Sequence, residues 1–264
     1  PDFKYWQGVE CAFYAAFYRV ATLGSGAGVA AIYYFNERGV PYSKGTGLYT
    51  IEYMLHKVSI ALFAGIFFIL NWGYMQKYYS QYDMTLLIGF GVTFVIAAVL
   101  LLFACSKKFH EVLLWIVRKL NRSGKLTEQV KKLEEQCAIL EDAAATLLKR
   151  GGLIAGCILK NLLKFTFWYG IPFLILAETG KLTLSQGLAV TSLAMMLAAV
   201  IPAPAGIGSS EFVLTMLLAK IVGTGAAGSV ALLYRFATFV LPFVIGAVVV
   251  VLWRRVHRST EKAA

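Results

Sequence analysis

One stretch constrains the fold of this chain more than any other: Pro202-Ala-Pro-Ala-Gly-Ile-Gly-Ser-Ser-Glu211. It interrupts a region in which no residue from Leu182 to Ser210 is charged. A run of that length suits a membrane-spanning helix, but proline lacks a backbone donor and glycine weakens helices. Non-helical backbone is tolerated inside a membrane only where protein buries it or where it lines a wet cavity. The break, with Glu211 directly behind it, therefore predicts the lining of a site.

The rest of the chain also has the composition of a membrane protein. Hydrophobic residues make up 59% of the 264 residues. Three further charge-free runs are close to the ~20 residues that cross a bilayer; they are Val58–Gln76, Met84–Ser106 and Phe236–Trp253. We therefore expect an all-α fold, a polytopic integral membrane helical bundle with two broken, re-entrant helix elements. The chain begins with proline rather than methionine, so we expect upstream helices to be missing.

The hydropathy pattern divides the chain into three parts. We expect a first membrane half over residues 1–105, a polar cytoplasmic insert over 106–150 and a second membrane half with a basic tail over 151–264. The predicted spans are Leu48–Trp72, Met84–Cys105, Leu153–Ala177 and Ala226–Trp253. The predicted broken segments are Cys11–Phe35 and Leu182–Val222. The predicted connections are a polar turn at Asn36–Gly47, an aromatic loop at Tyr74–Tyr82 and a tight turn at Glu178–Lys181.

Glycine and proline mark the break in each interrupted segment, in the pattern that points to a transporter's binding site. The break residues are Gly24, Gly26, Gly28, Pro202, Pro204, Gly206 and Gly208. A shift of 178 residues aligns the two breaks and also aligns the glycine turn Gly45–Gly47 with Gly223–Gly225 and Lys57 with Arg235. These matches favour an inverted repeat, with chance matching of glycines as the open alternative.

The insert holds ten of the 25 basic residues. Its first part places Phe109, Val112 and Ile116 on one helical face among basic residues, which is typical of a helix lying in the membrane interface. Its second part repeats apolar residues in heptads from Leu126 to Leu147. Two interpretations stay open. One is a coiled coil that makes a homo-oligomer; the other, which we favour because three heptads are short, is an intramolecular helical hairpin.

The net charge of +11 fits basic residues that flank membrane spans on the cytoplasmic side. By that rule the insert and the C-terminal tail are both cytoplasmic, the first broken segment opens to the cytoplasm and the second opens to the outside. No nucleic-acid recognition motif accompanies the charge, so we expect no nucleic-acid partner. The cysteines and histidines show no ligand spacing, so we expect no metal and no cofactor. A GxGxxG match at Gly223–Gly228 lacks the βαβ context of a dinucleotide site.

Two ionisable residues lie deep in the second half: Glu211 and Arg235. Charged residues inside spans are costly and usually functional. One interpretation is an ion pair that only tethers two helices. The other is that Arg235 binds a lipid phosphate, since a guanidinium matches phosphate oxygens, while Glu211 orients it or binds a cationic headgroup.

The first half and the middle of the chain carry similar residues. Arg19 lies one turn before the Gly24 break, and Glu52, His56 and Lys57 share a helical face. Lys160 and Lys164 are one turn apart with Asn161 beside them, and either form a basic pocket or leave Lys160 to snorkel toward water. We expect lipid contacts from Arg19, Glu52, Lys57 and Lys160 in addition to Glu211 and Arg235, and no catalytic residue.

The second half resembles a known family. The residues that carry the likeness are the Ile201–Glu211 break, Ile221-Val-Gly223, Leu232-Leu-Tyr-Arg235 and Leu241-Pro242. Together they resemble the lysylphosphatidylglycerol synthase transmembrane family over about 65 residues. The earlier segment Gly24–Lys57 is similar to the family's glycine-rich segment, but it lacks the usual proline.

The resemblance implies a multi-pass protein of the bacterial-type plasma (inner) membrane. It implies flippase-like translocation of phospholipids with modified headgroups, such as lysylphosphatidylglycerol, or of polyprenyl-linked lipids. These lipids are the expected partners. Two alternatives stay open: a membrane-embedded lipid-modifying enzyme, phosphatidylglycerol lysyltransferase by family name with Glu211 as a general base, and an assembly subunit that binds through the heptads. We expect the protein to lack the soluble aminoacyl-transfer domain of full synthases.

Overall fold

The computed structural model describes residues 3–80, 106–121, 127–148 and 150–261, and between them positions 84, 88–89, 91–92, 94–95, 98–99 and 102. In these parts of the chain every regular element is a helix, which confirms the all-α fold. Among the described residues, three helices are long and apolar enough to cross a membrane: Tyr42–Leu70, Pro204–Val222 and Thr224–Arg255. The span expected at Met84–Cys105 lies largely outside the described residues.

Each of the segments 1–105, 106–150 and 151–264 contains helices. The first half contains α1 (Tyr5–Ala21), α2 (Gly26–Glu37), α3 (Tyr42–Leu70) and α4 (Trp72–Tyr79). The insert contains α6 (Lys107–Leu120) and α7 (Thr127–Leu148). The second half contains α8 (Gly151–Leu176), η2 (Ala177–Thr179), α9 (Leu184–Ala198), η3 (Pro204–Gly206), α10 (Ser209–Val222), α11 (Thr224–Arg235), η4 (Phe236–Val240) and α12 (Leu241–Glu261).

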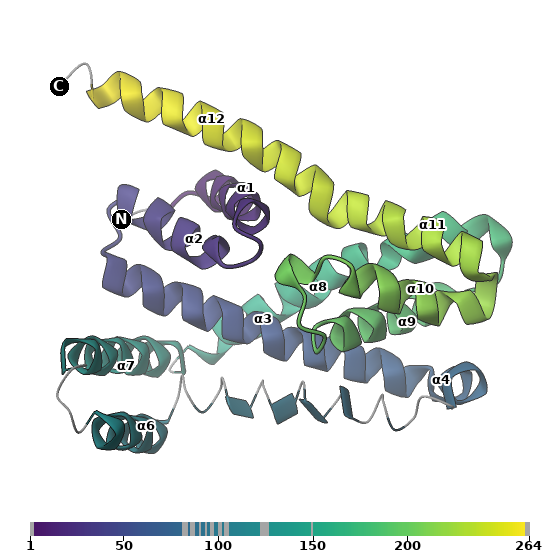
Figure 1. The fold of residues 1–264 in the computed structure, drawn as a ribbon, viewed down its shortest axis with the longest axis horizontal. Helices are drawn as coiled ribbons and strands as arrows, with labels where there is room; N and C mark the ends of the chain where they lie inside the picture. Colours follow the sequence, from purple (N-terminus) through teal and green to yellow (C-terminus); the bar gives the residue numbers. More distant parts are fainter. Residues whose placement is uncertain are drawn as a thin grey trace.

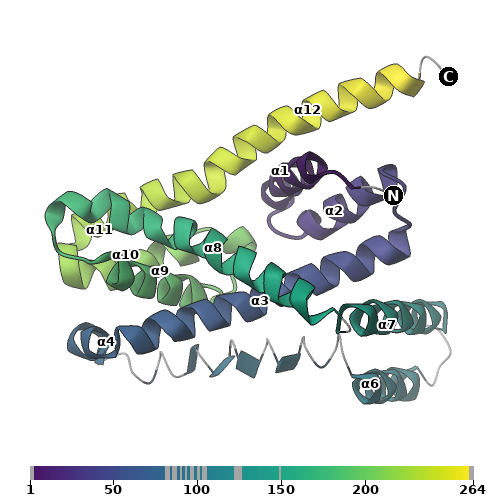
Figure 2. The same ribbon diagram turned by 180° about the vertical axis from the view of Figure 1, so that it is seen from behind.

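The long helices α3, α8 and α11–α12 form the frame of the molecule (Figure 1). The insert and both chain termini lie at one end of this frame, called the insert end below. The short helix α4 and the turn before α11 lie at the opposite end, as the reverse view also shows (Figure 2). Both views show α6 and α7 end-on, so these two helices run across the long ones.

Two helical hairpins enter this frame from opposite ends. The helices α1 and α2 pack against each other, and so do α9 and α10. With 17, 12 and 15 residues, α1, α2 and α9 are shorter than the ~20 residues needed to cross a bilayer. Helix α10 has 14 residues and reaches 19 only together with the η3 turn before it. The hairpin tips meet inside the molecule, because a Cβ atom built on Gly24 would lie 3.2 Å from the backbone nitrogen of Ala205.

Left-handed backbone makes both tips. In the first tip Leu23 and Gly24 have φ of 52° and 109°. In the second, Ala205 has φ of 53° and is followed by Gly206 and Gly208, which also have positive φ. Such values favour glycine, which explains the composition of both breaks. The first break is shorter than we predicted: Gly26 already begins α2, and Gly28 lies inside that helix against Tyr49. Helix N-terminal amides need no intrahelical acceptor, so glycine is tolerated at that point.

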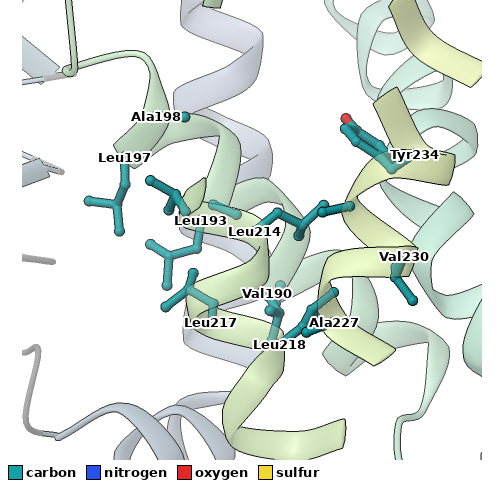
Figure 3. Packing of buried hydrophobic residues seen from close by; sticks show 14 of the residues in the cluster. Val190, Leu193, Leu197, Ala198, Leu214, Leu217, Leu218, Ala227, Val230 and Tyr234 are labelled. Atoms are coloured by element: carbon teal, nitrogen blue, oxygen red, sulfur yellow. The ribbon is translucent and has the colours of Figure 1, made fainter. Parts of the chain in front are cut away.

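The main core lies where α9, α10 and α11 meet, and Figure 3 shows its packing. Leu193 and Leu214 are 1% and 0% exposed.

The predicted aromatic loop after α3 was wrong, because residues 72–79 form the helix α4. Its Tyr79 is buried and donates a hydrogen bond of 3.0 Å to the carbonyl of Leu217, so packing on α10 holds this segment helical.

One other boundary differs from the prediction. The helix α3 begins at Tyr42, so the polar turn is shorter than Asn36–Gly47. Pro41 precedes the first turn of α3, where its missing backbone donor costs nothing.

In the insert, α7 packs against α3 and α6. Two of its heptad residues, Val130 and Cys137, are buried within the chain. This is the packing that the intramolecular interpretation predicts.

A close contact between α1 and α12 gives a stability prediction. At Gly246 an added Cβ would collide with the carbonyl oxygen of Phe13 and lie 3.0 Å from the Cβ of Phe17. Because backbone cannot move aside as a flexible side chain can, Gly246→Ala should destabilise the protein by about 1–3 kcal/mol. Thermal unfolding in detergent measures this. The control is Gly156→Ala in α8, where an added Cβ meets nothing within 4 Å. An unchanged midpoint for Gly246→Ala would refute this α1–α12 contact.

Candidate functional site

An ion pair joins the two predicted residues of the second half. Arg235 Nε lies 3.0 Å from Glu211 Oε1, with side chains 17% and 22% exposed. Arg235 also donates from Nη2 to the carbonyl of Ala205 at 3.0 Å. The last residue of α11 is therefore fastened both to α10 and to the hairpin tip before it.

Glu211 has further partners on its own helix. Its Oε2 accepts hydrogen bonds from the backbone amide of Gly208 at 3.0 Å and from the hydroxyl of Ser210 at 2.8 Å. The contact with Gly208 satisfies one of the free amides at the start of α10. Glu211 thus caps its helix and binds Arg235 at the same time. The ion pair of the first interpretation is present, and it holds the broken backbone in shape.

Arg19 approaches the same point from the first hairpin. It lies in the last turn of α1, close enough to Arg235 for the two positive charges to repel. Phe239 contacts both: the guanidinium carbons lie 5.7 Å (Arg19) and 3.9 Å (Arg235) from its ring centroid. Such cation–π contacts partly offset the burial of the charges. Among the residues that the structure describes, the buried Nε of Arg19 has no hydrogen-bond partner.

Phe239 owes its position to a local irregularity. It lies in η4, a single turn of π-helix that joins α11 to α12. Such turns are rare and often occur at functional sites. Here the π turn directly follows Arg235. The wider turn sets the position of the Phe239 ring relative to the Arg235 guanidinium that stacks on it.

Together these groups form an electropositive centre where the hairpin tips meet. Arg235 is paired with the carboxylate of Glu211, the charge of Arg19 lies close to that of Arg235, and the Nε of Arg19 has no hydrogen-bond partner among the described residues. Guanidinium groups bind phosphate oxygens with two parallel hydrogen bonds, more strongly where water is scarce. The arrangement can therefore hold a phosphate or another oxyanion in the middle of the molecule.

A second polar cluster lies between α3 and α8. Lys164 Nζ lies 3.1 Å from Nδ1 of His56 and donates to the amide oxygen of Asn161 at 3.0 Å. Glu52 lies one turn before His56 and attracts the charge of Lys164. Sequence reasoning missed this contact, because spacing along one helix does not tell which residue of another helix faces it.

The other predicted lysines lie apart from this cluster. Lys160 is exposed, and the structure places it in neither group of charges. Lys57 lies 5.2 Å from the ring centroid of Tyr53 and lines a small cavity of about 80 Å³. That cavity reaches Ala199 and Val200 at the end of α9. Lys57 therefore lies beside the second hairpin tip rather than beside Arg235.

A wider groove runs between α10 and α11. Its volume is about 600 Å³, and its lining is mostly apolar. Glu211 lies on its lining, as does Lys220 further along α10. Nine residues of helix separate the two, or about 13 Å at 1.5 Å per residue. The groove therefore leads from the centre of the molecule along the outer part of α10.

Comparison with known proteins gives one match. The family model described as "Lysylphosphatidylglycerol synthase TM region" matches residues 2–246. No curated protein and no solved structure matches the chain.

Proposed function

Because this chain belongs to the family of the lysylphosphatidylglycerol synthase TM region, we propose that it moves a lipid between the leaflets of a membrane. The cargo is a phospholipid with a modified headgroup, such as lysylphosphatidylglycerol, or a polyprenyl-linked lipid. One observation carries the proposal. Arg19 of the first hairpin lies close enough to Arg235, which is bound to the tip of the second hairpin, for their charges to interact, and among the described residues the Nε of Arg19 has no hydrogen-bond partner.

In this mechanism the lipid phosphate binds between the arginines. Arg19 supplies the unused donor, and Arg235 supplies charge while it stays fastened to the tip through Ala205. A cationic headgroup would be attracted to the carboxylate of Glu211, which lies on the lining of the α10–α11 groove. The acyl chains remain in the bilayer, because only the polar part of the lipid is costly to move through hydrocarbon.

Each hairpin would close the site toward its own end. The order of elements supports this: hairpin α1–α2 leads into the long helix α3, and hairpin α9–α10 leads into α11–α12. This is the order expected of an inverted repeat, in which rocking of one half against the other opens a central site to each face in turn. The ten basic residues of the insert favour a cytoplasmic insert end by the positive-inside rule. The resemblance to the family favours the bacterial-type plasma (inner) membrane.

The alternatives have weaker support. A lipid-modifying enzyme would use Glu211 as a general base, but both oxygens of that carboxylate already pair with Arg235, Gly208 or Ser210. An assembly subunit would need its heptad stripe exposed, yet Val130 and Cys137 are buried against the protein's own helices.

Reconstitution tests the proposal. The purified protein is placed in vesicles that carry a fluorescent phospholipid, and a membrane-impermeant quencher reports the lipid in the outer leaflet. The protein should raise the quenched fraction from about half toward completeness within minutes. Gly156→Ala, which alters no charge, should act like the wild type. Quenching equal to that of empty vesicles, with protein shown to be folded and inserted, would contradict lipid movement.

A further inference from the structure

We infer that one face of helix α6 binds negatively charged phospholipids at the membrane surface. This face, called the lysine-flanked face below, consists of Val112, Trp115 and Ile116, with Lys108 one turn before Val112 and Lys119 one turn after Trp115. The three apolar side chains are 55%, 60% and 42% exposed. An exposed apolar patch marks an interaction surface, and lysines at both of its ends favour a negatively charged partner. The face is separate from the centre between the hairpin tips, so the inference does not rest on the proposed function.

Packing on α7 decides which face of α6 stays open. His110 is buried, and Arg118 donates from Nε to Glu134 of α7 at 2.9 Å, so this side of α6 is held by protein. Val112 comes two residues after His110, which places it about 200° further around the helix at about 100° per residue. The lysine-flanked face therefore points away from α7. The charge of Arg118 is engaged by Glu134, whereas Lys108 and Lys119 lie at exposed positions.

The orientation of α6 is that of a helix lying in a membrane surface. The 29 residues of α3 extend over about 43 Å at 1.5 Å per residue, which matches the ~40–45 Å of a bilayer with its headgroups. Both α6 and α7 run across α3 at its insert end, and α7 lies between α3 and α6 (Figures 1 and 2). Helix α6 therefore runs parallel to the membrane plane at the level of the headgroups, and its lysine-flanked face is turned away from the protein.

The side chains of this face suit lipid headgroups. Tryptophan is enriched at membrane–water interfaces, where its ring has an apolar body and a polar edge. Trp6, near the N-terminus at the insert end, and Trp72, at the start of α4 at the opposite end, are also exposed, so exposed tryptophans occur at both ends of the frame. Lys119 holds its ammonium 4.7 Å from the ring centroid of Trp115. Lysine stems cover apolar surface while their charges reach lipid phosphates, so both parts of the face act on one partner.

Fluorescence quenching tests the contact with lipid. The protein is reconstituted into vesicles with equal amounts of phosphatidylcholine and phosphatidylglycerol, and bromine on the acyl chains of one lipid quenches tryptophans that touch it. The signal of Trp115 is the difference between the wild type and Trp115→Phe. This signal should be quenched, and more strongly when phosphatidylglycerol carries the bromine. A Trp115 signal that neither brominated lipid quenches belongs to a ring in water or against a second copy of the chain, and it overturns the inference.

Charge variants test the preference for negatively charged lipid. In Lys108→Gln/Lys119→Gln the preference of the Trp115 signal for phosphatidylglycerol should fall by up to about fivefold for each lysine, the equivalent of about 1 kcal/mol. The matched control is Lys131→Gln/Lys132→Gln, which removes two exposed charges from α7 and should keep the preference. Its one printed ion pair, Lys132 with Glu128, is exposed and contributes little to stability. Equal quenching by the two lipids in the wild type, or an equal loss of preference in both double variants, overturns the inference.

Discussion

Replacing Arg19 by glutamine should weaken binding of a lipid phosphate by about 10-fold to 150-fold, the equivalent of one charged hydrogen bond of about 1.5–3 kcal/mol. The protein should otherwise remain folded, because the Nε of Arg19 is unused and its charge is repelled by Arg235. The measurement is the amount of phospholipid that stays bound through purification, determined by mass spectrometry, together with the rate of lipid movement in vesicles. Both should fall in parallel.

Arg38→Gln is the matched control for Arg19→Gln. Arg38 follows α2 in the same hairpin, stacks on Tyr34 at 5.1 Å and pairs with Glu10 at 3.0 Å, away from the tip. Its loss should cost some stability and leave lipid binding unchanged. If the two variants bind lipid equally well, the centre between the hairpin tips is not the phosphate site.

Replacing Glu211 by alanine should lower the stability of the protein by about 3–5 kcal/mol, because it leaves the largely buried charge of Arg235 without its partner. The start of α10 would also lose its contact with the Gly208 amide, adding to the loss. At about 2–4 °C per kcal/mol, the unfolding temperature should fall by about 6–20 °C. The unfolding temperature of Glu211→Gln should fall less, since the amide oxygen of glutamine still caps α10.

The double variant Glu211→Gln/Arg235→Gln separates structure from function. If the ion pair only tethers α10 to α11, removing both charges should recover much of the stability and leave lipid movement near the wild-type rate. If Arg235 binds phosphate, stability should recover while movement stays lost. A double variant that moves lipid normally would therefore remove Arg235 from the proposed site.

Much of the fold follows from elementary features of the sequence. The lengths of the apolar runs predicted the long helices, and glycine and proline predicted both breaks. Helix boundaries were less accurate where tertiary contacts decide them. Tyr79, for example, sits in a stretch with weak hydropathy, and its helix is held by a hydrogen bond to Leu217 and by burial against α10. No local pattern could have indicated those partners.

The site was predictable in part. A charge inside an apolar run carries a high free-energy cost, and this alone identified Arg19, Glu211 and Arg235 as candidates. That Gly24 would lie beside Ala205 depends on how the hairpins enter the frame, which no spacing within one segment reveals. For the same reason His56 was not assigned a role, and Lys160 was chosen where Lys164 makes the contact. Residues on different helices are brought together by packing, not by their separation in the chain.

The π turn at Phe236–Val240 adds one residue to the helix that runs from α11 into α12. A π turn holds one residue more than the α-helix around it, so deleting one residue there would leave an uninterrupted α-helix. Such a turn accommodates its extra residue locally, so the residues beyond it would keep nearly the same orientation relative to α11, and Gly246 would still face Phe13 and Phe17. The change would fall inside the turn, where Phe239 would lose its present place beside the guanidinium groups of Arg19 and Arg235. One extra residue can thus shape a charged centre and leave the packing of the helix beyond it unchanged.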